Sequence, residues 1–263
     1  MPTLNIAHRG GAALHPENSL AAFRHALALG CDGAELDVQL SADGAAVVYH
    51  DARLHPGYTR KDGAWLEGVT PRLKDLTLSE LRGFDIGRAR PGSDYARAHP
   101  DQRAADGERI PTLEQVAALV RPAPDFRLWV ELKCDDSEDS ADPVALADAA
   151  LTVVADADFL LRTAFVGFDW RALARVKQKA PSAEIWCTTA EEVEASAPLF
   201  HIIRAMGAAG WFAHHPRLTQ EAAALARAYG LKLAAWTVND EAEMRRLCAL
   251  GAEALCTDRP DIF

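Results

Sequence analysis

Several features are missing from this 263-residue chain, and each absence excludes a class of protein. No apolar run reaches the roughly 20 residues of a membrane-spanning helix, and no basic segment precedes an apolar one near the N-terminus, so neither anchoring nor secretion is indicated. The five cysteines are scattered and form no CxxC pair, which argues for reduced thiols rather than a disulfide framework. We therefore expect a cytoplasmic protein without stable membrane association.

Positive charge is also scarce. The chain holds 28 Lys and Arg against 38 Asp and Glu, so its net charge is −10 and its surface repels a polyanion such as DNA. We expect no nucleic-acid partner, and any bound phosphate must be held by local cations. With 49% hydrophobic residues, the chain can bury a full core and has the size of one large α/β domain.

Short strand-like runs alternate with helical patterns along most of the chain. Strands are predicted over 4–7, 34–38, 128–132, 163–166, 184–187, 210–212, 231–236 and 253–256, and helices over 16–29, 112–120, 143–155, 170–179, 191–206, 219–229 and 240–250. Eight strands alternating with helices favour a (β/α)8 TIM barrel, with a doubly wound open sheet as the alternative. The last outer helix is expected to be missing or vestigial.

One segment interrupts this alternation. Ala42-Asp43-Gly44 predicts a hairpin turn into residues 45–49, so this run is expected to fold back on the second strand. Residues 51–110 then contain only a short helical pattern near 78–81, and structureless connections of that length are uncommon inside compact domains. We expect a single domain over 1–263, with an insertion at about 51–110 that covers one end of the barrel as a lid.

Acidic side chains cluster on two of the predicted strands. Because side chains alternate faces along a strand, Glu35 and Asp37 point the same way, as do Glu131 and Lys133. The C-terminal ends of barrel strands meet at one mouth, so the three acids are expected to converge there with His8. Crowded carboxylates raise one another's pKa unless a cation neutralises them, and oxygen ligands suit Mg²⁺ or Ca²⁺. We expect one divalent cation.

Four further residues are candidates for chemistry at this mouth. His8 and His50 each directly follow an apolar run beside a charged neighbour, and imidazole gives or takes a proton near neutral pH. Arg9 offers a planar charged fork for phosphate oxygens, although a salt bridge to an acid is the structural alternative. Trp236 either presents its ring to substrate or packs in the core.

Lys133 admits two functions. It can hold a phosphate as a point charge, or it can form a Schiff base with a carbonyl substrate, as in aldolase-type barrels. A Schiff-base lysine needs a lowered pKa, whereas Glu131 two residues away favours the protonated form. The phosphate-binding interpretation is therefore favoured.

Taken in order, these residues resemble the glycerophosphodiester phosphodiesterase family. The matching motifs span almost the whole chain in the family's order, which is far more specific than any one of them. They are His8-Arg9-Gly10-Gly11, Pro16-Glu17-Asn18-Ser19, Glu35-Leu36-Asp37-Val38, Val47-Val48-Tyr49-His50-Asp51, Ile110-Pro111-Thr112-Leu113, Val130-Glu131-Leu132-Lys133, Trp236-Thr237-Val238-Asn239 and Thr257-Asp258-Arg259-Pro260.

The resemblance implies an activity and a role for each site residue. It implies hydrolysis of glycerophosphodiesters to glycerol 3-phosphate and an alcohol, in a barrel with an insertion after the hairpin. It further implies these roles: a divalent metal on Glu35, Asp37 and Glu131, His8 with His50 as general acid and base, and Arg9 with Lys133 on the phosphate. The sequence departs from the family pattern in Cys134 after the lysine, in the curtailed C-terminal helix and in a longer, more charged stretch from Tyr95 to Gly107.

Three alternative functions remain at this point. A lysophospholipase D predicts an exposed apolar rim on the insertion, where only Trp65, Leu66, Phe84 and Ile86 are candidates. A lyase or aldolase on the same fold has no need for two histidines and Arg9. A non-catalytic phosphate-binding protein would keep the two cations but has no use for the acids and histidines.

Overall fold

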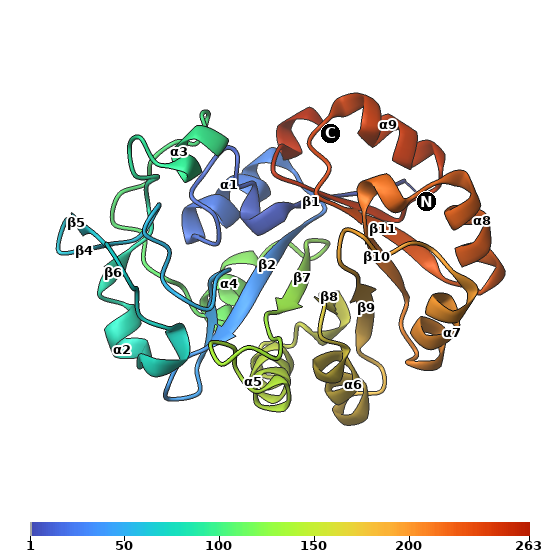
Figure 1. Ribbon diagram of the computed structural model, residues 1–263, viewed down its shortest axis with the longest axis horizontal. Helices are drawn as coiled ribbons and strands as arrows, with labels where there is room; N and C mark the ends of the chain where they lie inside the picture. The colour runs from blue at the N-terminus through green and yellow to red at the C-terminus, as the bar shows by residue number, and fades with distance from the viewer. Residues whose placement is uncertain (1) are drawn as a thin grey trace.

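The computed structural model describes residues 2–263 and contains a closed barrel of eight parallel strands surrounded by helices (Figure 1). Each barrel strand pairs with its neighbours, and the pairing of β1 with both β2 and β12 closes the circle. The barrel strands are β1 (Leu4–Ala7), β2 (Gly33–Leu40), β7 (Arg127–Leu132), β8 (Thr163–Gly167), β9 (Glu184–Thr188), β10 (Gly210–His214), β11 (Lys232–Trp236) and β12 (Ala254–Thr257). The predicted TIM barrel is confirmed.

The helices pack on the outside of the barrel (Figure 1). They are α1 (Leu20–Leu29), α4 (Leu113–Val120), α5 (Pro143–Asp156), α6 (Trp170–Lys179), α7 (Ala197–Ala205), α8 (Gln220–Ala228) and α9 (Glu241–Ala249). The strands are covered on both faces, because the helices pack on one face and the barrel interior lies on the other. All eight residues of β2 are accordingly buried. After β12 only a 3-10 turn, Pro260–Ile262, remains, so the chain ends without a full outer helix, as predicted.

Two apolar layers hold the barrel. Outward side chains such as Leu36 pack against the helices in one large cluster, whereas inward side chains form a second cluster inside the barrel. Trp129, Trp186 and Phe212 fill that interior, with ring centroids 5.0 and 5.3 Å from Trp129.

Two helix starts differ from the prediction. The first helix begins at Leu20 rather than at Pro16, because Ser19 is its N-cap and accepts a hydrogen bond from the Ala22 amide. Asn18, with φ of 56°, lies in a tight turn before that cap. Helix α7 begins at Ala197, six residues later than the predicted 191, after the Ser196 cap.

The predicted hairpin arm is β3 (Ala46–Val48), which pairs antiparallel with β2. Residues 51–110 then form their own small structure, visible at the left of Figure 1. It contains a three-stranded sheet in the order β5 (Ala64–Trp65), β4 (Arg60–Lys61), β6 (Phe84–Asp85), and two short helices, α2 (Leu78–Leu81) and α3 (Asp94–Ala98). The sequence pattern missed these strands because two-residue strands have no readable alternation.

Candidate active site

The three acids predicted from strand alternation lie together at the mouth of the barrel. Glu35 and Asp37 extend from β2 and Glu131 from β7, where Asp37 is in register with Glu131. Each of the three offers a carboxylate oxygen within 4.8 Å of the others. Glu35 and Asp37 are each 1% exposed, and Glu131 is 8% exposed. The three carboxylates are therefore buried and lie next to one another.

The pKa values of two of these acids, Glu35 and Asp37, shift in opposite directions. Burial, followed by the charges of Asp37 and Glu131, raises the pKa of Glu35 well above its ordinary range. Burial also raises the pKa of Asp37, but Arg9 and then His50 outweigh it and hold that pKa below its ordinary value. One Glu35 oxygen, Oε1, is buried without a hydrogen-bond partner in the described residues. An unpartnered buried carboxylate oxygen beside two other acids fits a cation ligand.

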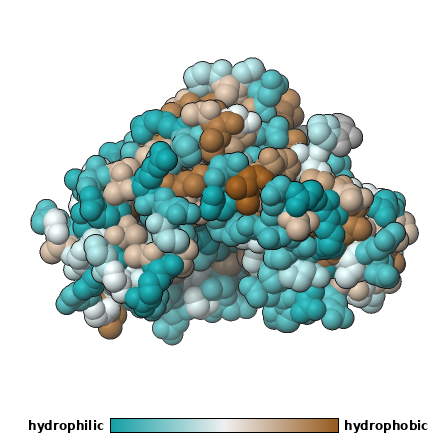
Figure 2. Space-filling view, turned by 90° about the horizontal axis from the view of Figure 1, so that it is seen from above, coloured by the Kyte–Doolittle hydropathy of each residue, from teal (hydrophilic) through white to brown (hydrophobic). Residues whose placement is uncertain are grey.

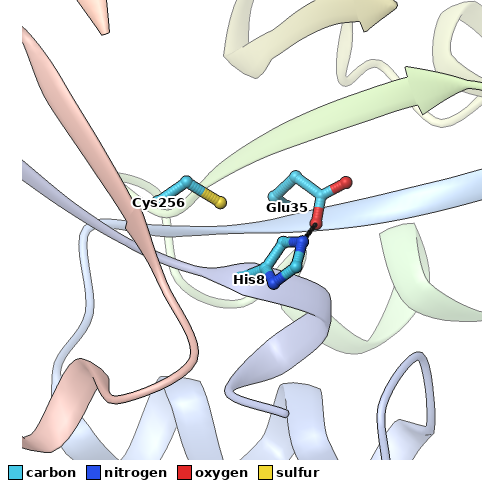
Figure 3. Close-up of side chains that lie close together, drawn as sticks. All are labelled: His8, Glu35 and Cys256. Atoms are coloured by element: carbon cyan, nitrogen blue, oxygen red, sulfur yellow. Dashed lines mark ion pairs between the residues drawn. The ribbon is translucent and has the colours of Figure 1, made fainter. Parts of the chain in front are cut away.

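His8 follows β1 and lies beside this cluster (Figure 3). Its Nδ1 is 2.6 Å from Asp258 Oδ1 and its Nε2 is 3.8 Å from Glu35 Oε2. Asp258 is itself fixed by the Asn239 amide, which donates to Oδ2 at 2.7 Å. Although burial raises the pKa of Asp258, His8 outweighs it and lowers that pKa to about 2. The ionised Asp258 therefore orients the imidazole, with Nε2 turned toward the acids.

His50 reaches the same cavity from the hairpin arm. Its Nδ1 is 2.7 Å from Asp51 Oδ1, so it too is oriented by a carboxylate. A cavity of about 210 Å³ is lined by both His8 and His50, together with Glu35 and Glu131. The two predicted histidines thus face one volume from different segments of the chain.

Arg9 is held among acids rather than left free. Its backbone N–H donates to Glu35 Oε2 at 3.0 Å, its Nη1 donates to Glu17 Oε1 at 2.8 Å, and its Nε lies 3.2 Å from Asp37 Oδ2. Burial lowers the pKa of Arg9, but Glu17 and Asp37 outweigh it and raise that pKa well above its ordinary value. Arg9 therefore forms the salt bridges that were the structural alternative for it, and it also lines the cavity where a phosphate could bind.

Lys133 and Trp236 complete the wall of the cavity. Lys133 Nζ donates to Glu131 Oε1 at 2.9 Å and lies 3.6 Å from Asp37 Oδ1. Burial lowers the pKa of Lys133, but these acids outweigh it and raise the pKa above its ordinary value, which disfavours a Schiff base. The half-buried Trp236 ring packs edge-on against Phe168 at 5.5 Å.

Several residues of the site were not assigned a role from the sequence. Asp258, Asn239 and Glu17 each fix a candidate residue, and all three belong to motifs noted above. Tyr95 donates from its hydroxyl to Glu17 Oε2 at 2.7 Å and comes from α3, far along the chain. The motifs contained the first three, but no sequence signal indicates Tyr95.

The comparison with known proteins agrees with this geometry. The model of the glycerophosphoryl diester phosphodiesterase family matches residues 8–262. The chain belongs to this family. A glycerophosphodiester phosphodiesterase of Caldanaerobacter subterraneus is 32% identical over 99% of this chain and 96% of its own length. As a member of the glycerophosphoryl diester phosphodiesterase family, the chain is a phosphoric diester hydrolase.

Solved structures show the same fold. A Silicibacter pomeroyi protein described as a candidate glycerophosphoryl diester phosphodiesterase superposes with a TM-score of 0.91 at 29% identity, over 99% of this chain and 92% of that one. A phosphodiesterase of Oleispira antarctica, solved with its product sn-glycerol-3-phosphate, gives a TM-score of 0.79 at 25% identity, over 99% and 94% of the two chains. The family resemblance inferred from the motifs is confirmed.

Proposed function

We propose that this phosphodiesterase hydrolyses small glycerophosphodiesters to sn-glycerol 3-phosphate and an alcohol, and that it needs one Mg²⁺ or Ca²⁺ ion for this. The observation that carries the proposal is that three acids close enough to share one cation, Glu35, Asp37 and Glu131, lie beside a cavity lined by two histidines and two cationic side chains. The product complex of the Oleispira relative supports glycerol 3-phosphate as the product.

The ion would be held by Glu35, Asp37 and Glu131. Their buried oxygens lie close enough to share one cation, and Glu35 Oε1 has no other partner in the described residues. A set of oxygen ligands alone fits Mg²⁺ or Ca²⁺ better than zinc. When bound, the ion would neutralise these acids and supply positive charge against the phosphoryl oxygens.

Arg9 and Lys133 would hold the phosphate. Both residues line the cavity, and each side chain is 19% exposed. Arg9 is fixed by Glu17 and Lys133 by Glu131, so neither has to be ordered when the substrate binds. In a chain of net charge −10, these two local cations attract the anionic phosphodiester to the mouth.

The histidines would transfer protons. One takes the proton of the attacking hydroxyl, and the other gives a proton to the oxygen of the leaving alcohol as the P–O bond breaks. The carboxylates of Asp258 and Asp51 orient the imidazoles of His8 and His50. The same pair serves whether the attacking hydroxyl belongs to water or to the glycerol portion of the substrate.

We further propose that residues 51–110 form an insertion of the single barrel domain and cover the site. The segment is tied to the connection between β1 and α1 by Tyr95, by the Gln102 side-chain amide that donates to Ala12 O at 2.8 Å, and by the Arg103 backbone amide that donates to Leu14 O at 2.9 Å. Trp236, which lines the cavity together with His8 and Lys133, would contact the glycerol or alcohol portion of the substrate.

A lipid substrate is not favoured. Of the four apolar residues that a lipid-binding rim could use, Phe84 and Ile86 are buried in the core of the insertion, and Trp65 and Leu66 are half-buried. The face in Figure 2 is mostly hydrophilic, with hydrophobic residues in small separate groups. Over residues 2–263, none of the helices combines the length and apolar character required to cross a bilayer.

The decisive experiment couples release of glycerol 3-phosphate from glycerophosphocholine to a dehydrogenase, with the protein assayed before and after EDTA treatment. We expect activity to be lost on chelation and restored by Mg²⁺ or Ca²⁺, because the crowded acids need a cation. Full activity in EDTA would reject the metal requirement. Cleavage of lysophosphatidylcholine in preference to glycerophosphocholine would instead support the lipid substrate.

A further inference from the structure

A second set of metal-binding side chains lies at the mouth and overlaps the first. Cys256 extends from β12 into the barrel, where its thiol lies near His8 and Glu35 (Figure 3). One ligand atom from each of the three residues lies within 4.8 Å of the others. This set provides sulfur, nitrogen and oxygen, whereas the proposed Mg²⁺ or Ca²⁺ site provides oxygen only.

The imidazole of His8 is oriented as a ligand. The Asp258 carboxylate, 2.6 Å from Nδ1, accepts a hydrogen bond from that nitrogen, and Nε2 faces Glu35 at 3.8 Å, where the neutral imidazole offers its lone pair. Metal-binding histidines usually carry such a carboxylate on their second nitrogen, which fixes the ring and raises its basicity. Asn239 in turn fixes Asp258, so the ring orientation is held through two hydrogen bonds.

Glu35 has one buried carboxylate oxygen open to a ligand, the same oxygen that the proposed Mg²⁺ or Ca²⁺ ion would use. Its side chain is 1% exposed, and its Oε2 accepts the Arg9 amide hydrogen at 3.0 Å. Its Oε1 has no hydrogen-bond partner anywhere in the described chain. A buried carboxylate oxygen without a partner is costly unless something binds it.

We propose that Cys256, His8 and Glu35 form a second, inhibitory site for a soft divalent ion such as Zn²⁺. Thiolate, imidazole and carboxylate are the donors that zinc prefers, and they leave a fourth position open. Ligands of one zinc ion lie roughly 3 to 4 Å apart, so side-chain shifts of about 1 Å bring the three together. The inference rests on the proposed function only because Glu35 and His8 also have roles there, Glu35 as a ligand of the hard cation and His8 in proton transfer.

Binding at this site blocks the proposed chemistry. The zinc ion takes the Nε2 lone pair of His8, which then cannot move a proton, and it withdraws Glu35 from the hard cation. A thiol binds zinc as the thiolate, so the Cys256 proton passes to solvent as the Zn–S bond forms. No electron is transferred in this exchange.

The first experiment measures binding without any substrate. EDTA-treated, dialysed protein is supplied with excess Mg²⁺ and titrated with Co²⁺, whose bond to a thiolate gives a charge-transfer absorption in the near ultraviolet. We expect this band in the unmodified protein and its loss in Cys256→Ala. Cys248→Ala is the matched control, because Cys248 is exposed on α9 and should leave the band intact.

Displacement of the bound Co²⁺ by Zn²⁺ then gives the affinity of the protein for zinc. Cys256→Ala should weaken zinc binding by at least the roughly 10- to 100-fold that loss of an outer-shell partner costs. The same substitution should relieve inhibition of glycerophosphocholine cleavage by zinc, with each variant compared with its own zinc-free rate. A cobalt–thiolate band of unchanged intensity in Cys256→Ala, or no band in the unmodified protein, would overturn the proposal.

Two readouts separate this proposal from the proposed function. If no phosphodiester is cleaved but the band depends on Cys256, the site stands and the assigned substrate is wrong. If Cys256→Ala shows no cooperative thermal unfolding, Cys256→Ser replaces it, because the hydroxyl is close in size to the thiol and a poor ligand for soft ions. Retention of tight zinc binding by a folded Cys256→Ser would then overturn the proposal.

Discussion

At the scale of single residues, the backbone conformation of Arg9 explains how one residue contacts three acids. Its φ of 50° lies in the left-handed region, which few residues other than glycine adopt. This conformation turns the Arg9 amide toward Glu35 while the side chain extends toward Glu17 and Asp37. Strained conformations persist where their surroundings fix them, commonly at functional sites. The strain at Arg9 supports its assignment to the phosphate.

The histidine assignments lead to the first substitution experiment. His8→Ala and His50→Ala should each lower kcat by roughly 10²-fold or more, because each removes a proton-transfer group. Steady-state release of glycerol 3-phosphate measures the effect. His201→Ala, an exposed position on α7, is the control and should keep the full rate. Near-full kcat in either active-site variant would reject the role of that histidine.

Tyr95 provides a test of how the 51–110 segment acts on the site. Tyr95→Phe removes the hydrogen bond donated to Glu17, whose other oxygen holds Arg9. Hydrogen bonds to charged groups contribute about 1.5 to 3 kcal/mol, so we expect KM to rise by roughly 10-fold with a smaller fall in kcat.

Tyr229→Phe is the matched control for this substitution, because the Tyr229 ring packs against Phe200 away from the mouth. Its KM should match that of the unmodified enzyme. An unchanged KM in Tyr95→Phe, with the variant folded, would show that the contact with Glu17 does not position Arg9.

The sequence predicted the site residues unevenly. Glu35, Asp37 and Glu131 were predictable because strand alternation and the barrel mouth together fix where they point. Tyr95 was not, because its contact with Glu17 depends on how the 51–110 segment folds. Tyr95 lies 78 residues from its partner Glu17, and no local periodicity encodes such a contact.

At the scale of elements, the barrel strands were predicted best. Central parallel strands are buried on both faces, so they appear as short apolar runs bounded by polar turns. Helix starts were predicted less well, because Pro16 matches the residue type of a first helical position while the cap is formed by Ser19. The small sheet β5-β4-β6 depends on ion pairs such as Arg60 with Asp85, which no pattern of hydrophobicity indicates.

The junction of the first strand with α1 leads to a prediction on stability. Gly10 has φ of 83°, and a Cβ there would lie 2.7 Å from Ala22 Cβ and 2.9 Å from the Ala22 carbonyl carbon. Gly10→Ala should lower the free energy of unfolding by roughly 2 to 4 kcal/mol, because it combines left-handed strain with overpacking against backbone. Urea denaturation measures the change.

Gly30 is the control for this prediction. It has a similar φ of 77°, but nothing lies within 4 Å of its Cβ position. Gly30→Ala should therefore lower the free energy of unfolding by about 1 kcal/mol, because it introduces the left-handed strain but no steric overlap. Equal losses in the two variants would show that the approach of Gly10 to α1 contributes nothing.

At the scale of the whole molecule, the overall charge is negative, whereas two cationic side chains are gathered at the proposed substrate cavity. The surplus of acids gives the net charge of −10, yet Arg9 and Lys133 line the same cavity as Glu35 and Glu131. In the proposed function a bound cation would complete this arrangement, because the phosphate would then meet positive charge on several sides. The fold alone does not fix this chemistry, since TIM barrels support many reactions through their strand ends.

The same surplus of acids makes stability depend on pH, and Glu243 on α9 lets one contribution be isolated. Arg246 binds its carboxylate in a fork at 2.6 and 2.7 Å, and His215, in the turn after β10, adds a contact at 2.8 Å. The hydrogen bonds from Arg246 outweigh burial and lower the pKa of Glu243 to about 2. Because the folded pKa is below the unfolded one, the stabilisation is complete above the unfolded value of about 4.3 and is lost as pH falls toward 2.

Glu243→Gln should therefore lower the free energy of unfolding by about 1 kcal/mol at pH 7 and by almost nothing near pH 2, as measured by urea denaturation across that range. The small value allows for solvent screening of a partly exposed group. Glu241→Gln is the control, because Glu241 and its partner Arg245 are 64% and 65% exposed and their pair should contribute close to nothing at either pH. A loss in Glu243→Gln that stayed constant between pH 7 and pH 2 would mean that shape, rather than the charge bound by Arg246, holds α9 to the turn after β10.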